Sequence, residues 1–277
     1  MVELAELRSE AASKIRNLAD YDGRLGRAAH RVDEASKERP EAALAIYETA
    51  LMKSGRGEDE IRDLIREFRA TFEDEEEPLD IPRVSGIMNV EGDGWFFGAE
   101  NLRVLTGRLL GQFQHRVAQY NYVDEREVLR RWADGYDTRL FVRRRIHETE
   151  PVVGVVGELD LTLFQYLRVV AGGNTLVPTE NVRRALGALG YEGDTYEILA
   201  HAEGLALHLD LPAPIVGEML EDLGREGFAD FPEPPREAAG PEEADDEGVP
   251  SEGGENKQPS PPEAGRADAP GTAGGEE

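Results

Sequence analysis

Two short segments of this 277-residue chain have residue types and spacing that could bind a phosphate group. The first is the glycine turn Gly154-Val-Val-Gly157, which leads into an apolar helix and could expose backbone N–H groups at its N-terminus. On spacing alone, a short buried strand or loop fits this segment equally well. The second segment is the start of a basic helix further along the chain. Gly154 and Gly157 are therefore candidate contacts to a DNA phosphate.

Residues 154–190 resemble the C-terminal half of the helix–hairpin–helix DNA glycosylase superfamily, the fold of endonuclease III-type repair enzymes. The resemblance is carried by residues 163–186, which read LFQYLRVVAGGNTLVPTENVRRAL. In that family an apolar helix leads through a glycine-containing turn to a proline or apolar residue. An aspartate follows, and then Val and a basic residue open the next helix. The resemblance implies a helical fold and duplex DNA as the partner. It also implies DNA contacts at Asn181, Arg183 and Arg184, in addition to Gly154 and Gly157.

The chain departs from the family at its catalytic positions. The family aspartate falls at Thr179, which cannot carry its negative charge. Bifunctional members use a hairpin lysine as nucleophile, but this chain has no lysine between Lys53 and Lys257. These differences argue against lyase activity. A monofunctional glycosylase would need a relocated carboxylate, for which Asp160 and Glu180 are the catalytic candidates.

The composition is strongly acidic and biased towards arginine. The formal net charge is −26, and lysine supplies few of the 31 basic residues. This pattern predicts a halophilic protein, although a GC-rich genome combined with an acidic tail would also produce it. In molar salt the Debye length falls to about 3 Å, so the net charge does not exclude a DNA partner.

The sequence also predicts several absences. Without cysteine, the chain cannot form disulfides or carry the cysteine-bound iron–sulfur cluster of many glycosylases. His201 and His208 could share a helix face, but two ligands are too few for a metal site, so we predict no metal and no cofactor. No apolar run approaches the length of a membrane span, and the N-terminus lacks the apolar core of a signal peptide. We therefore expect a cytoplasmic protein without membrane contact.

Apolar periodicity predicts an all-α helical bundle with a glycosylase-like C-terminal half. We divide the chain into an N-terminal helical region (1–79), a helical domain with the glycosylase-like motif (80–231) and a disordered acidic tail rich in Pro and Gly (232–277). Three local features are also expected. Asp22-Gly23 should form a turn, residues 78–98 should include one short strand, and Gly224 should end the last helix.

Arginines are concentrated between positions 126 and 145. They could form a phosphate-facing patch, or they could be neutralised by the acidic residues interspersed among them.

Three functions remain open at this stage. The preferred one is a DNA-associated protein on a glycosylase-like scaffold that lacks the usual catalytic residues. The alternatives are a helical protein-interaction or structural module without a DNA role, and a monofunctional glycosylase with a relocated carboxylate.

Overall fold

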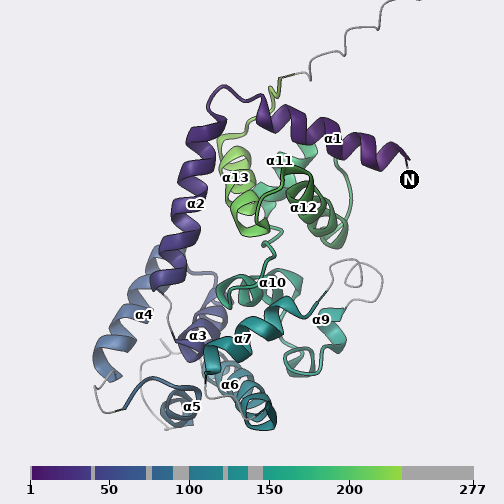
Figure 1. The fold of residues 1–277 in the computed structure, drawn as a ribbon. Coiled ribbons are helices and arrows are strands. Elements are labelled where there is room, and N and C mark those ends of the chain that lie inside the picture. The colour runs from purple at the N-terminus through teal and green to yellow at the C-terminus, as the bar shows by residue number, and fades with distance from the viewer. Residues whose placement is uncertain are drawn as a thin grey trace, which may run out of the picture. The chain divides into compact units, whose positions relative to one another are not determined.

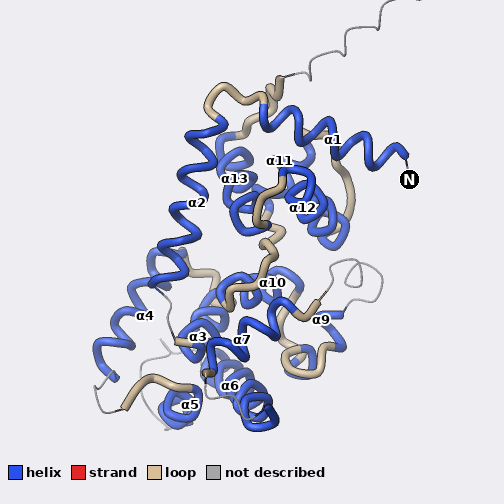
Figure 2. Tube along the Cα trace, in the orientation of Figure 1, coloured by secondary structure: helices blue, strands red, loops and turns tan. Residues whose placement is uncertain are grey.

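The computed structural model describes residues 2–38, 41–72, 77–89, 100–120, 124–136 and 146–232. Every regular element in these ranges is helical, which confirms the all-α prediction (Figure 1, Figure 2). The helices are α1 (Val2–Arg16), α2 (Tyr21–Glu38), α3 (Ala42–Met52), α4 (Glu58–Phe72), α5 (Ile81–Asn89), α6 (Glu100–Tyr120), α7 (Glu125–Asp134), α9 (Ile146–Thr149), the 3₁₀ turn η2 (Gly154–Val156), α10 (Leu161–Val170), α11 (Glu180–Ala188), α12 (Thr195–Leu209) and α13 (Ala213–Glu226).

Short polar side chains begin several of these helices. Asp124 starts α7, Asp160 starts α10 and Thr179 starts α11, each accepting hydrogen bonds from backbone N–H groups in the first turn. Asp194 and Glu197 form a full capping box at α12. Such caps satisfy N–H groups that have no partner inside the helix, so the local sequence fixes where these helices begin.

One group of helices is built around α3. Its residues from Ala42 to Leu51 are all buried, and it contacts α4, α5, α6, α7 and α10. The buried Glu48 accepts a hydrogen bond from the Tyr166 hydroxyl on α10, and Thr49 donates to the carbonyl of Ala45. The polar groups of this central helix are therefore satisfied inside the core.

A second group joins the first two helices to the last three. α1 contacts α12, α2 contacts α13, and α11 contacts both α12 and α13 (Figure 1). Residues 1–235 form one compact unit, and contacts such as α1 with α12 and α3 with α6 cross the boundary drawn between residues 79 and 80. That division stays a prediction. Apart from Pro232, the predicted tail lies outside the described residues.

The loop between α10 and α11 links the two groups. Gly173 lies so close to α7 that an added Cβ would stand 2.9 Å from the Ala133 Cβ. The Asn174 N–H donates to Asp134 at 2.9 Å, and the Asn174 side-chain oxygen accepts from the Ala213 N–H at 2.9 Å. This loop therefore fixes the end of α7 to the start of α13.

Two local expectations are wrong, and a third is wrong for the described part of its range. Residues 81–89 form α5 and no strand, because Asp80 accepts a hydrogen bond from the Arg83 N–H and Ile81, Val84 and Met88 share the buried face. The remainder of that stretch, residues 90–98, lies outside the described residues. The first turn lies before Tyr21, so Asp22-Gly23 falls inside α2. Gly224 lies within α13, where its missing side chain permits close packing against α11.

Candidate functional site

The predicted glycine turn is η2, and its apolar tip is exposed. The Val156 N–H donates to the carbonyl of Val153 at 3.1 Å, and the Gly157 N–H donates to the carbonyl of Gly154 at 3.2 Å. Gly157 adopts a left-handed conformation with φ of 71°, which favours glycine. The side chain of Val155 is 64% exposed. Two N–H groups of the turn thus have internal acceptors, while a valine faces outward.

Two cations lie beside the turn, brought there from distant parts of the chain. Glu158 accepts from Lys53, which directly follows α3, at 3.0 Å and from Arg108 of α6 at 2.9 Å. Sequence reasoning missed this cluster, because 105 and 50 residues separate its partners along the chain. Both cations are therefore paired with the same carboxylate, Glu158, next to the exposed tip.

A buried carboxylate supports the turn from the inside. Glu150 is 1% exposed and accepts hydrogen bonds from the Trp132 indole at 3.0 Å and from the Tyr136 hydroxyl. It also accepts from the N–H groups of Val152 and Val153. Burial raises the pKa of Tyr136, and the hydrogen bond to Glu150 raises it further. With four donors already bound, Glu150 holds the segment that precedes η2.

Asp160 and Glu180, the two catalytic candidates, are placed differently. Asp160 is the N-cap of α10, where its carboxylate accepts from the Leu163 N–H at 2.9 Å. Glu180 lies in the first turn of α11 with its side chain 75% exposed, and its nearest cation is Arg183 at 3.7 Å. Catalysis by either residue stays a prediction, and Asp160 already has a structural role.

The start of α11 is the second predicted phosphate contact, and a carboxylate of the protein itself lies against it. Thr179 accepts from the Val182 N–H at 3.1 Å and donates its own proton to Glu221 of α13. Asn181 donates from its side-chain nitrogen to the other oxygen of Glu221 at 2.6 Å. A negative charge is favoured at a helix N-terminus, and here α13 supplies it.

Arg183 and Arg184 also have internal acceptors. Arg183 donates to the carbonyl of Gly193 at 2.7 Å and to the Thr195 hydroxyl at 3.0 Å. Arg184 donates to the carbonyl of Gly224 at 3.0 Å. These bonds tie α11 to α12 and α13, so both arginines contribute to packing in this region.

The two predicted phosphate contacts lie against different helices. η2 contacts α6 and α9, whereas α11 contacts α12 and α13. The DNA role of Gly154, Gly157, Asn181, Arg183 and Arg184 stays a prediction. Each of the three side chains in that set is hydrogen-bonded within the protein.

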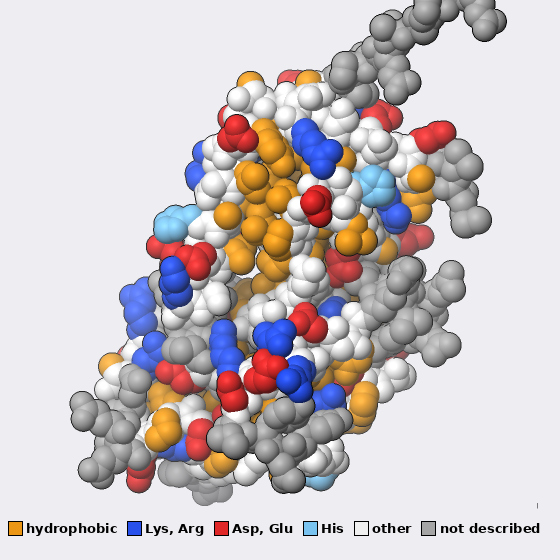
Figure 3. All heavy atoms as spheres, viewed as in Figure 1, with side chains coloured by type: hydrophobic (Ala, Val, Ile, Leu, Met, Phe, Trp, Pro, Cys, Tyr) orange, Lys and Arg blue, Asp and Glu red, His pale blue; other side chains and the backbone are white. Residues whose placement is uncertain are grey.

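Two arginines of α7, Arg130 and Arg131, are paired with acidic residues of the same helix. Arg130 and Arg131 donate to Glu127 at 2.6–3.0 Å, and Arg130 also pairs with Asp134 at 3.2 Å. The two arginines lower the pKa of Glu127 to about 2. Figure 3 shows acidic and basic side chains intermixed over this helix. The arginines between 137 and 145 lie outside the described residues.

Arg168, inside the stretch that carries the family resemblance, is buried. It donates to the carbonyls of Ala133 at 2.8 Å and Tyr136 at 3.2 Å, and to the side chain of Gln165 at 3.1 Å. Burial lowers its pKa. Its hydrogen bonds close the C-terminal end of α7, which is a structural role that the sequence did not reveal.

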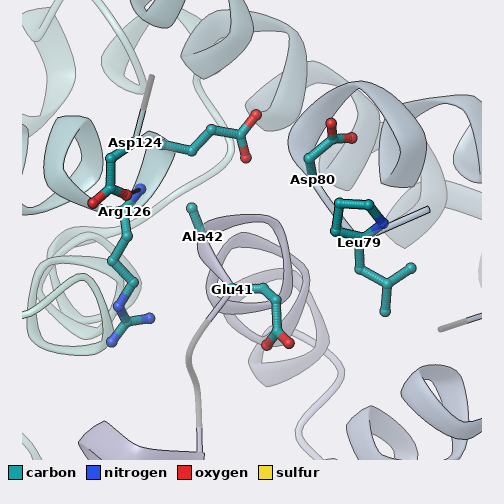
Figure 4. A pocket seen from close by; sticks show the side chains of 8 residues that line it. Glu41, Ala42, Leu79, Asp80, Asp124 and Arg126 are labelled. Carbon is teal, nitrogen blue, oxygen red and sulfur yellow. Dashed lines mark hydrogen bonds between the residues drawn. The ribbon is translucent and has the colours of Figure 1, made fainter. Parts of the chain in front are cut away.

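A shallow pocket lies where the N-termini of three helices meet (Figure 4). Its lining includes Glu41 before α3, Asp80 before α5 and Asp124 before α7. Glu125 accepts from the Ile81 N–H at 2.9 and 3.2 Å, and burial raises its pKa. Figure 4 shows the carboxylates of Glu41 and Asp80 pointing away from each other. Asp80, Asp124 and Glu125 accept from backbone N–H groups at helix starts, whereas Glu41 accepts from the Arg69 side chain.

In the described part of the chain, no group of three or more His, Cys, Asp or Glu residues is placed to hold a metal ion. No helix in these ranges is long and apolar enough to span a membrane. No family model, no curated protein and no solved structure matches this chain.

Proposed function

We propose that this chain is a helical protein-interaction module without a DNA role, and that its contact point is the turn around Val155. The observation that carries the proposal is the 64% exposure of Val155 beside two cations, Lys53 and Arg108, that are already paired with Glu158. A contact point of this kind binds another protein through its apolar tip.

The surroundings of the turn support a protein partner. Val104, 39% exposed, lies one helical turn before Arg108 on the same face of α6. Arg108 in turn pairs with Glu158 next to the tip. An exposed valine beside paired charges fits the apolar contacts and polar rim of a protein interface, and Val104 adds exposed apolar surface on the neighbouring helix α6.

The predicted DNA contacts give the rival function less support. A DNA phosphate at the start of α11 would face the carboxylate of Glu221, which already accepts from Thr179 and Asn181. A phosphate at the start of α10 would face Asp160, which caps that helix. Close anions repel phosphate by several kcal/mol at low effective dielectric.

Photo-crosslinking from position 155 tests the proposal. A photoreactive amino acid replaces Val155, and the source cells are irradiated. The adduct is then digested separately with nuclease and with protease. We expect an adduct whose mass falls with protease treatment of the partner and not with nuclease. The same amino acid at the exposed Glu192 is the matched control and should give no such adduct. A nuclease-sensitive adduct, or none, contradicts the proposal.

DNA association is the second candidate, and Lys53 and Arg108 favour it. Both cations lie beside the glycine turn and share one carboxylate, Glu158, so the cluster carries a net positive charge. Duplex binding that is weakened by a Lys53→Ala, Arg108→Ala double variant, and unchanged by the exposed control Arg66→Ala, would favour this function. We expect no such binding.

We infer the cellular environment of the module from its composition alone. A net charge of −26 with arginine as the main cation supports a cytoplasm rich in salt.

A further inference from the structure

The two cations beside the exposed tip of η2 have hydrogen-bond donors to spare. Lys53 donates to one carboxylate oxygen of Glu158 at 3.0 Å, and Arg108 donates to the other oxygen at 2.9 Å. In the described part of the chain, neither cation has a second acceptor. A lysine carries three donors and an arginine five, so most donors of this pair are available to a further acceptor.

These donors can be reached from solvent. The side chain of Arg108 is 58% exposed, and those of Lys53 and Glu158 are each 32% exposed. Val155 lies three residues before Glu158, and η2 contacts α6, the helix of Arg108. A partner that reaches the tip of η2 therefore meets the two cations as well.

The charge of this cluster is opposite in sign to that of the whole protein. Two cations share one carboxylate, which leaves one positive charge in a chain of net charge −26. The next acidic side chain, Asp160, accepts from the Leu163 N–H as the cap of α10. The buried Glu150 accepts from four donors on the other side of the turn. Neither carboxylate is paired with Lys53 or Arg108, so the excess positive charge remains at the surface.

The complement of this surface is an apolar pocket with a carboxylate at its edge. The pocket would receive Val155, and the carboxylate would accept from Arg108 and Lys53. Glu158 demonstrates that a single carboxylate can accept from both cations, with one oxygen for each. Hydrogen bonds between charged groups are stronger than neutral ones. A phosphate backbone fits this surface less well, because it offers the valine no apolar pocket.

We propose that the partner of the Val155 turn is a protein segment in which an Asp or Glu lies close to the apolar residues that receive Val155. This inference rests on the proposed protein contact and adds the chemistry of the partner. Arg108 and Lys53 bind the partner's carboxylate, while Glu158 competes for the same two cations. Glu158 therefore limits the affinity of the turn for its partner.

Peptide selection on the full chain tests this chemistry. A phage library of random peptides is selected against the wild type, and the enriched peptides are synthesised and titrated at low salt. We expect them to contain Asp or Glu near bulky apolar residues. Their affinity should fall about tenfold in a Lys53→Ala, Arg108→Ala double variant, because two contacts to the carboxylate are lost. Glu158→Gln should raise the affinity about threefold, because it removes the competing charge.

Two controls identify the contact. Arg66→Ala removes an exposed arginine on α4 and should leave the affinity unchanged. Changing the Asp or Glu of the peptide to its amide should weaken binding to the wild type about tenfold. The same peptide change should have little effect on the Lys53→Ala, Arg108→Ala double variant, because its contacts are already absent there.

The outcomes separate this inference from the proposed function. Peptides that Val155→Asp weakens, but that are neutral or basic or bind the double variant equally well, would overturn the acidic partner and leave the protein contact in place. No enriched peptide, or none that Val155→Asp weakens, would overturn both. Displacement of the peptide by duplex DNA, or a dimer of the chain that Val155→Asp dissociates, would identify a different occupant and overturn the proposal.

Discussion

The guanidinium of Arg24 on α2 donates two hydrogen bonds to the carboxylate of Glu226 on α13, at 3.0 and 2.8 Å. Arg24 also donates to Asp20 at 3.0 Å and lies 5.7 Å from the centre of the Phe228 ring. The two partners are 202 residues apart in the sequence. Their ion pair therefore joins α2, near the N-terminus, to α13, the last helix of the described chain.

Replacing Arg24 with Ala should destabilise the protein by about 2 kcal/mol, because charged hydrogen bonds from a nearly buried arginine are lost. Arg66, which is exposed and pairs with Asp63 on its own helix, is the matched control and should cost less than about 0.5 kcal/mol. Urea unfolding followed by circular dichroism measures both. Equal effects of the two substitutions would contradict the structural role of Arg24.

The same pair predicts a dependence on pH. The hydrogen bond from Arg24 lowers the pKa of Glu226, so the folded state releases this proton more readily than the unfolded chain. The stabilisation is present above the unfolded pKa of about 4.3 and is lost as the pH falls through the folded value. The stability difference between wild type and Glu226→Gln should therefore shrink on acidification. A difference that stays constant from neutral to strongly acid pH would contradict this account.

Gly224 should not tolerate a side chain. An added Cβ would lie 1.9 Å from the carbonyl oxygen of Asn181, so α13 would have to move away from α11. Gly224→Ala should cost about 3 kcal/mol or more. Gly187→Ala on α11 meets no atom within 4 Å and should be neutral or stabilise by up to about 1 kcal/mol. Thermal unfolding of both variants decides this, and similar melting temperatures would contradict the close packing.

Glu150 should stabilise the segment that precedes η2. Glu150→Ala leaves the Trp132 and Tyr136 donors and two backbone N–H groups without their acceptor, which should cost about 3–5 kcal/mol. Glu148→Ala, an exposed change two residues away, is the control and should cost less than about 0.5 kcal/mol. Denaturant unfolding compares them. A small loss in Glu150→Ala would show that the segment is held by other contacts.

Local signals in the sequence were sufficient to predict that most of the described chain is helical. Asp124 and Asp194 are N-caps, and such caps can be read locally because they act through N–H groups two or three residues away. Prolines and glycines misled the interpretation of residues 78–89, where Asp80 starts a helix that tolerates Pro82 in its first turn. Gly224 was misread for the opposite reason, since its requirement comes from α11 and not from its own helix.

The groups around the candidate site depend on contacts that no local pattern encodes. Between residues 154 and 190, the structure contains the predicted glycine turn and the predicted helix start, where Thr179 is the N-cap. The partners of its polar residues come from elsewhere: Glu158 meets Lys53 and Arg108, and Asn181 meets Glu221. Such pairings follow from tertiary packing, so sequence alone could not distinguish a DNA contact from an internal one.

Binding of labelled duplex DNA, followed by fluorescence anisotropy at low and at molar potassium chloride, tests the central claim most directly. The wild-type chain is compared with an Arg183→Ala, Arg184→Ala double variant. Because both arginines are bonded within the protein, we predict no saturable binding at either salt concentration and the same signal from both proteins. Saturable binding by the wild type that is lost in the double variant would contradict the account.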